Sequence, residues 1–66
     1  MKLETKLREY RAKTGMRQDE LAAKVGVRRE TIGNLENGRY NPSLRLAMDI
    51  AAVFDCTVEE LFRFID

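Results

Sequence analysis

The sequence predicts a small all-α domain of four or five helices around one core. Apolar residues recur at the three- and four-residue spacing of amphipathic helices in several separate segments. Glycines or clusters of turn-forming residues separate these segments. The chain has 66 residues, so residues 1–66 are treated as one domain, near the size at which a lone core is marginal. Association into a dimer is therefore favoured.

The first helix is expected from about Leu3 to Lys13, because Leu3, Leu7 and Tyr10 share one face. Gly15 lies just beyond this segment and supplies a C-terminal stop. The chain contains no linker, repeat or low-complexity segment that would divide it.

The stretch from Arg17 to Gly38 predicts two short helices joined by a tight turn. Leu21, Ala22 and Val25 make one apolar face of the first of these helices. Gly26 comes next, and a glycine there can adopt the left-handed conformation that ends a helix. The apolar line of the second helix consists of Val27, Thr31, Ile32 and Leu35. This layout is a helix-turn-helix unit, whose second helix lies in the major groove of DNA.

The second half of the chain predicts a loop and two further helices. Turn formers fill residues 37–42, and either Asn41 or Ser43 caps the next helix. A central buried helix is expected from the helical spacing of Leu44, Ala47, Ile50, Ala51 and Phe54. Thr57 and Glu60 have the spacing of a capping box, which begins a short last helix through Leu61 and Phe62.

Three segments, QDELAAKVGV, ETIGNLENGRYNPSL and TVEELF, resemble the lambda Cro and C1 repressor type of helix-turn-helix domain, also called the Xre family. The resemblance covers nearly the whole chain. It implies a sequence-specific regulator of transcription that binds double-stranded DNA, acts as a homodimeric repressor and recognises an inverted-repeat operator. Compact dimeric members of this family carry short strands outside the helices. By this resemblance, Met1 to Leu3 and Phe62 to Ile65 pair as a two-stranded ladder.

The resemblance also assigns residues to DNA. The family reads bases from the positions of Arg28, Arg29, Glu30 and Asn34. Arginine can form two hydrogen bonds to guanine, asparagine can do the same to adenine, and glutamate can accept a hydrogen bond from the cytosine amino group. For Glu30, an equally weighted alternative to base contact is an ion pair that holds a neighbouring arginine in place. Gln18 matches a glutamine that binds phosphate and orients the next helix, and Thr31 is expected at a thymine methyl or a phosphate. Further phosphate contacts are expected from Arg17, Arg39, Tyr40, Arg45 and the backbone amides of Asn37 and Gly38.

The same resemblance implies two structural features. Arg11 and Glu36 match a partly buried salt bridge that ties the first helix to the end of the third. Arg17 and Arg28 stand where the family commonly has a serine or threonine cap, and losing a cap costs about 1 kcal/mol. A basic side chain there can compensate by binding phosphate, so stability would depend on DNA or other anions.

Two positions leave alternatives open. Gly33 lies inside a helix, where glycine costs about 0.5–1 kcal/mol relative to alanine. It marks either a close approach of the helix backbone to the groove or a neutral replacement. Phe62, Phe64 and Ile65 make the tail too apolar for water, so they either form the dimer interface or close the monomer core.

Charge is uneven along the chain despite a net charge of +1. Residues 1–45 contain eleven Lys and Arg against six Asp and Glu, whereas residues 46–66 contain one against five. A basic front suits a protein that faces phosphates on one side, although ordinary solvated surface explains the same counts.

Other classes find little support in the composition. Histidine is absent, and no nucleophile beside a base, glycine-rich phosphate loop or metal-ligand cluster occurs, so neither an enzyme nor a cofactor or metal site is expected. The single Cys56 is expected to be a small buried thiol. A lone thiol and the lack of a membrane span or signal peptide fit a cytoplasmic protein. The rival function is a protein-interaction module, such as an antitoxin that masks a partner.

Overall fold

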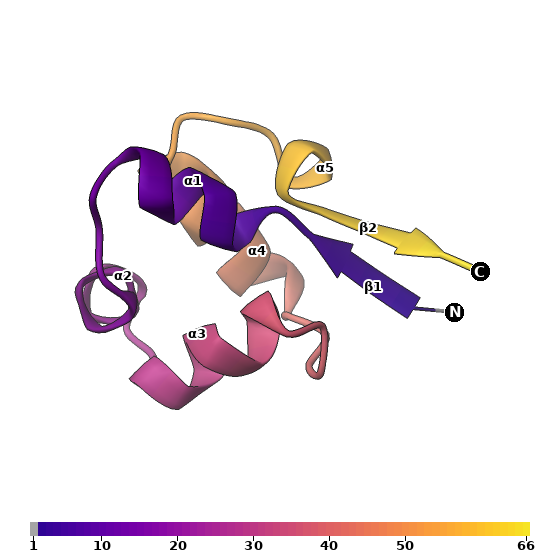
Figure 1. Cartoon of the computed structure of the whole chain (residues 1–66), viewed down its shortest axis with the longest axis horizontal. Coiled ribbons are helices and arrows are strands. Elements are labelled where there is room, and N and C mark those ends of the chain that lie inside the picture. Colours follow the sequence, from indigo (N-terminus) through magenta and orange to yellow (C-terminus); the bar gives the residue numbers. More distant parts are fainter. Residues whose placement is uncertain (1) are drawn as a thin grey trace.

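The computed structural model describes residues 2–66, which form five helices and one small sheet (Figure 1). The elements are β1 (Lys2–Thr5), α1 (Leu7–Lys13), α2 (Gln18–Val25), α3 (Arg29–Glu36), α4 (Leu44–Val53), α5 (Val58–Leu61) and β2 (Phe62–Ile65). The predicted fold class, a compact helical domain with a ladder formed by the termini, is confirmed. None of the helices between residues 2 and 66 has the length and apolar character needed to cross a membrane.

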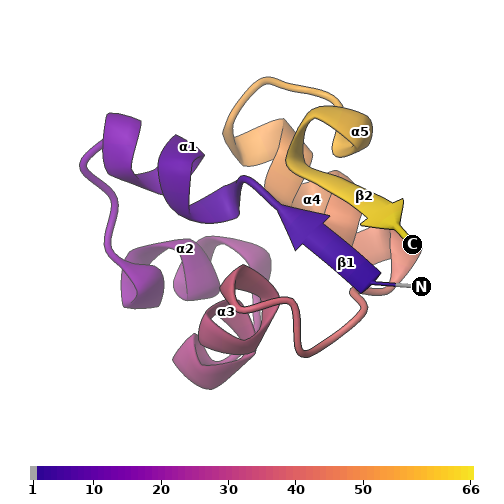
Figure 2. The same ribbon diagram turned by 45° about the vertical axis from the view of Figure 1, so that its right-hand side comes forward.

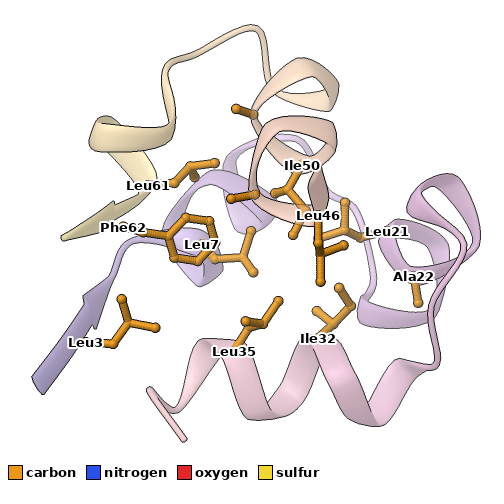
Figure 3. Close-up of a cluster of buried hydrophobic side chains, with 12 residues drawn as sticks. Leu3, Leu7, Leu21, Ala22, Ile32, Leu35, Leu46, Ile50, Leu61 and Phe62 are labelled. Atoms are coloured by element: carbon orange, nitrogen blue, oxygen red, sulfur yellow. The ribbon is translucent and has the colours of Figure 1, made fainter. Parts of the chain in front are cut away.

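One apolar core holds the elements together, and every helix and both strands contribute to it (Figure 3). Its largest fully buried side chains are Leu7, Leu21, Ile32, Leu35, Ile50 and Leu61. In α4 the buried face is formed by Leu46, Ala47, Ile50 and Ala51. The sequence predicts Leu44 on this face, but it is 73% exposed, because the first turn of α4 extends beyond the core.

The N-terminal segment differs from the expected helix. The helix α1 begins at Leu7 rather than Leu3, and the preceding residues pair antiparallel with β2. Leu3 remains buried, but it reaches the core from a strand whose register partner is Phe64. The predicted ladder is therefore confirmed for the described residues, while Met1 lies outside them. Lys6 lies between the two elements, and the Thr5 Oγ1 accepts a hydrogen bond from the Leu7 N–H at 3.1 Å where α1 begins.

Local capping signals identify the later boundaries well. Ser43 is the cap of α4, and its Oγ accepts from the Leu46 N–H at 3.1 Å. At α5 the Thr57 hydroxyl accepts from the Glu60 N–H at 3.1 Å and the Glu60 carboxylate accepts from the Thr57 N–H at 2.9 Å. The capping box is thus complete. Its helix is shorter than expected, since Phe62 already belongs to β2.

Candidate nucleic-acid interface

The helices α2 and α3 form the predicted helix-turn-helix. Gly26 ends α2 with φ 73°, and the Val27 N–H donates to the Ala22 carbonyl at 3.0 Å, which fixes the turn. Figures 1 and 2 show α3 on one side of the molecule and α5 on the opposite side. The face of α3 away from α5 is therefore open to a partner.

The side chains of α3 divide into an inner and an outer set. Ile32 and Leu35 are fully buried against the core. Arg29, Glu30 and Asn34 are exposed, as is Arg28 at the N-cap, whereas Thr31 is half-buried. The structure thus brings together the four residues predicted to read bases. Glu30 forms no salt bridge within residues 2–66, so the alternative, an ion pair that holds a neighbouring arginine, does not form in this part of the chain.

The predicted Arg11–Glu36 salt bridge is present and anchors the end of α3. Arg11 donates to the Glu36 carboxylate through Nε at 2.6 Å and Nη2 at 3.2 Å. The Glu36 side chain is fully buried, and the Arg11 side chain is 17% exposed. Arg11 also donates through Nη1 to the Met16 carbonyl at 2.9 Å, so the pair ties α1 to both the α1–α2 connection and α3.

Gln18 extends this network toward the exposed face. Its Nε2 donates to Glu36 Oε1 at 2.9 Å, while its Oε1 accepts from Arg29 Nη1 at 3.0 Å. The buried carboxylate thereby fixes the orientation of the Gln18 amide, because a carboxylate can only accept. The Gln18 carbonyl oxygen is then directed at Arg29. A side chain predicted to bind phosphate also holds a predicted base-reading residue.

The environment of Glu36 keeps it charged. Burial alone raises the pKa of this carboxyl, but the hydrogen bonds from Arg11 and Gln18 outweigh burial and hold the pKa below its ordinary value. The pKa of Arg11 is raised in turn by its hydrogen bond to Glu36. Both groups therefore carry full charge at neutral pH.

Sequence reasoning missed Arg8, which also contacts this network. Its Nε donates to Glu36 at 3.4 Å and its Nη2 donates to the Asn37 Oδ1 at 3.3 Å. Arg8 lies one helical turn before Arg11, so the three-residue spacing would have placed both on one face. The side chain of Arg8 is 62% exposed, so Arg8 is the outer of the two arginines that contact Glu36.

The N-termini of α2 and α3 lack the usual side-chain caps, as the two arginines predicted. Neither Arg17 nor Arg28 accepts a hydrogen bond from its helix, because an arginine side chain has no acceptor. At α2 half of a capping box remains, since the Arg17 N–H donates to the Glu20 carboxylate at 2.9 Å. Arg17 also pairs with Asp19 at 3.2 Å. Arg28 forms no salt bridge within the described chain and keeps its charge free for an anion.

In the loop after α3, two backbone amides are hydrogen-bonded within the domain. The sequence predicts that the amides of Asn37 and Gly38 bind phosphate, but they donate to the carbonyls of Gly33 and Leu35, each at 3.1 Å. Gly38 has φ 69°, and a Cβ there would lie 2.8 Å from the Leu3 carbonyl oxygen. Gly38 is therefore required by the fold, and we remove the two amides from the predicted phosphate contacts. Arg39 and Tyr40 remain exposed, and Arg45 is exposed but pairs with Asp49 at 3.4 Å.

The three apolar tail residues do not share one surface. Phe62 is only 7% exposed and belongs to the monomer core, which agrees with the alternative that the tail closes the core. Phe64 is 52% exposed, and Ile65 is half-buried. Because side chains alternate along a strand, Phe64 and Ile65 point to opposite faces of the ladder.

A helix-turn-helix whose second helix exposes Arg29, Glu30 and Asn34 defines a DNA-binding regulator of the helix-turn-helix class. No group of metal-ligating side chains that could hold an ion occurs in residues 2–66. The helix-turn-helix family model matches residues 7–61, and the chain belongs to this family. The resemblance to Cro/C1-type regulators is thereby confirmed.

Individual relatives agree with this assignment. An HTH-type transcriptional regulator of Archaeoglobus fulgidus is 64% identical over 64 residues, which cover 97% of this chain and 91% of that one. The HTH-type transcriptional regulator YgzD of Bacillus subtilis is 40% identical over 60 residues and 91% of each chain. The restriction-modification controller protein C.AhdI of Aeromonas hydrophila has a similar structure, with TM-score 0.75, 35% identity and 82% of each chain covered.

Proposed function

We propose that this helix-turn-helix regulator is a homodimeric repressor that inserts α3 into the major groove of an inverted-repeat operator. The observation that carries the proposal is the division of α3 into a buried apolar face and an exposed face bearing Arg29, Glu30 and Asn34. These side-chain types hydrogen-bond base edges in the major groove.

The polar network supports the same function. Arg29 is held by Gln18, and Gln18 is held by the buried Glu36, so the Arg29 side chain needs less ordering on binding. Arg28 and Arg39 add charge on the same segment, from the start of α3 to the loop after it. Backbone phosphates fix the register of such a helix, and base contacts then read the sequence.

The test is selection of bound sequences from a randomised DNA pool, and then titration of the selected site at two salt concentrations. We expect an inverted repeat with half-sites about one DNA turn, roughly 34 Å, apart. The logarithm of the affinity should fall linearly with the logarithm of the salt concentration, with a slope proportional to the number of phosphates contacted.

Two arginine variants sharpen the test. Arg29→Ala should cost about 1–3 kcal/mol and relax preference at one base pair of each half-site. Arg39→Ala is the matched comparison, because it removes the same charge from a predicted phosphate contact. It should weaken all sequences alike and reduce the salt slope by about one. Unchanged preference in Arg29→Ala would remove Arg29 from the reading set.

The absence of any enriched sequence would refute the proposal. Weak, salt-sensitive and sequence-independent binding would leave the protein-interaction module as the better function. In that case substitutions on the tail would abolish function, whereas Arg29→Ala would not.

A further inference from the structure

Two hydrogen bonds connect the interior of the domain to one of the side chains predicted to read bases. The fully buried side chain of Glu36 accepts from Gln18 Nε2 at 2.9 Å, and Gln18 Oε1 accepts from Arg29 Nη1 at 3.0 Å. These two hydrogen bonds are termed the Arg29 relay. Gln18 is half-buried and Arg29 is exposed, so the relay runs outward from the core. Arg28 is the contrasting neighbour, because it is also exposed but forms no salt bridge within residues 2–66.

The negative charge of Glu36 decides which way the Gln18 amide points. A carboxylate has only acceptor oxygens, whereas the end of a glutamine has an NH2 donor on one side and a carbonyl acceptor on the other. Gln18 therefore satisfies Glu36 only with its NH2 group, which leaves its carbonyl oxygen for an outer donor. Arg29 is such a donor, and an arginine side chain cannot accept. The flipped amide would place two acceptors together at Glu36 and two donors together at Arg29, so it is unfavourable at both ends.

Glu36 is itself held in one position at the end of α3. Arg11 donates to both of its carboxylate oxygens, at 2.6 and 3.2 Å, and a contact of this kind fixes the plane of the carboxylate. Glu36 is the last residue of α3, Arg29 is the first, and Gln18 is the first residue of α2. The relay thus joins both ends of α3 through the start of α2.

We infer that Glu36 is a positioning residue for base recognition, which acts through Gln18 to hold Arg29 and thereby strengthens the preference of Arg29 for guanine. The inference rests on the proposed function and deepens it. Arginine reads guanine through two hydrogen bonds, to O6 and N7. The guanidinium has five N–H donors, and Gln18 occupies one of them at Nη1. Four donors remain, so Arg29 can stay bound to Gln18 while it binds both guanine acceptors.

The preference is strengthened because Arg29 is restrained before it meets DNA. Ordering one long side chain at an interface weakens binding by about 2- to 12-fold. An Arg29 that is already held by Gln18 loses less freedom when it binds guanine. A base without a matching pair of acceptors gains nothing from this restraint. Loss of the relay should therefore reduce the preference for guanine at one base pair and leave the preferences at other positions unchanged.

Three single variants separate the relay from the salt bridge. Glu36→Gln gives this side chain an NH2 group, which should face Gln18, because Arg11 keeps the remaining oxygen. The Gln18 amide should then flip, present its NH2 group to Arg29 and release it. Gln18→Leu removes the relay but leaves the Arg11–Glu36 salt bridge in place. Arg11→Lys is the matched structural control, because it loses the two-oxygen contact but keeps the Glu36 charge and its hydrogen bond to Gln18.

An exchange of the two side-chain types separates positioning from stability. In the double variant Glu36→Gln with Gln18→Glu, the amide at position 36 can donate to the carboxylate at position 18, which can accept from Arg29. The order of donors and acceptors is restored, but the salt bridge to Arg11 is still lost. The double variant should recover the guanine preference of the wild type without recovering its stability. Its affinity for all DNA should stay lower, because a carboxylate at position 18 repels phosphate.

Two measurements test the relay, with circular dichroism and urea unfolding to verify the fold and stability of each variant. NMR relaxation of the arginine side-chain Nε groups in the DNA-free protein reports the order of Arg29, with Arg28 as the internal reference. Competition titration then compares half-sites that differ only at the base pair whose preference Arg29→Ala relaxes. The ratio of their affinities is the guanine preference.

We expect Arg29 to be more ordered than Arg28 in the wild type, in Arg11→Lys and in the double variant. It should be as mobile as Arg28 in Glu36→Gln and Gln18→Leu. In these two variants the guanine preference should fall about 2- to 12-fold, whereas Arg11→Lys should lose stability but no preference.

Several results would overturn the inference. These are an Arg29 as mobile as Arg28 in the wild type, an Arg29 base pair without guanine, or an unchanged preference in folded Glu36→Gln. If Glu36→Gln does not fold, an unchanged preference in Gln18→Leu has the same meaning. An equal loss of preference in Arg11→Lys would make the role of Glu36 structural only.

The inference and the proposed function fail separately. A wild type that selects a DNA sequence, with a guanine preference that persists in every folded variant, refutes the inference alone. A wild type that selects no DNA sequence refutes the proposed function, whatever the order of Arg29.

Discussion

Replacing Glu36 with alanine should destabilise the domain severely, and the structure gives the size of the effect. The substitution removes the acceptor of four hydrogen bonds, two from Arg11 and one each from Gln18 and Arg8. Arg11 is then left 17% exposed with only the Met16 carbonyl as a partner. Leaving one charge of a buried pair without its partner typically costs about 3–5 kcal/mol. A domain of this length has only about 3–10 kcal/mol in total, so the variant should be near the limit of folding.

Urea unfolding at one fixed protein concentration is the assay, and the shift of the midpoint at constant slope gives the loss. Glu4→Ala is the matched control. The Arg63–Glu4 pair is 2.7 Å long, nearly the same as the 2.6 Å of Arg11–Glu36, but its side chains are 67% and 42% exposed. An exposed pair is worth about 0–1 kcal/mol, so this control should lose little.

A double variant separates the two sources of the loss. Replacing Arg11 with methionine in the Glu36→Ala background removes the unpaired charge and fills its space with apolar atoms. Part of the lost stability should then return. If Glu36→Ala and Glu4→Ala cost the same, burial of the pair has no special weight and the reasoning is wrong.

Three further predictions concern the same helices. Gly33→Ala should raise the free energy of unfolding by about 0.5–1 kcal/mol, because a Cβ there meets only Gln18 Nε2 at 3.9 Å. DNA titration of this variant then decides whether the bare backbone at Gly33 is needed for close approach to the major groove. Arg28→Ser should restore a cap worth about 1 kcal/mol in thermal unfolding without sulfate, and sulfate should stabilise the wild type more than the variant. The free energy of unfolding should decline as the pH falls below about 4.5, because the pKa of Glu36 is lowered in the folded state alone; an equal decline in Glu36→Gln would contradict this.

The sequence predicted best those features whose determinants are close together along the chain. Gly26 comes directly after the apolar face of α2, and the two partners of the Thr57–Glu60 capping box are three residues apart. Their geometry depends on local backbone preferences, which a sequence displays without any tertiary contact. The helix-turn-helix was predictable for this reason.

The errors arose where distant segments decide the conformation. Leu3 and Leu7 have the spacing of one helical face, but Leu3 pairs with Phe64, whose contribution cannot be seen from residues 1–13. The exposure of Leu44 depends likewise on where the core ends around α4. Periodicity gives the conformation that a segment prefers alone, whereas pairing and burial depend on its neighbours in the fold.

Two glycines illustrate how the structure separates fold from function at the interface. A Cβ at Gly38 would lie 2.8 Å from the Leu3 carbonyl oxygen, so the fold itself excludes every larger residue. At Gly33 the backbone is helical and the nearest contact of a Cβ is 3.9 Å, so the fold would accept alanine. The fold of residues 2–66 therefore does not require a glycine at this position. If Gly33→Ala gains stability but loses affinity for DNA, the bare backbone serves the groove, whereas unchanged affinity identifies Gly33 as a neutral replacement.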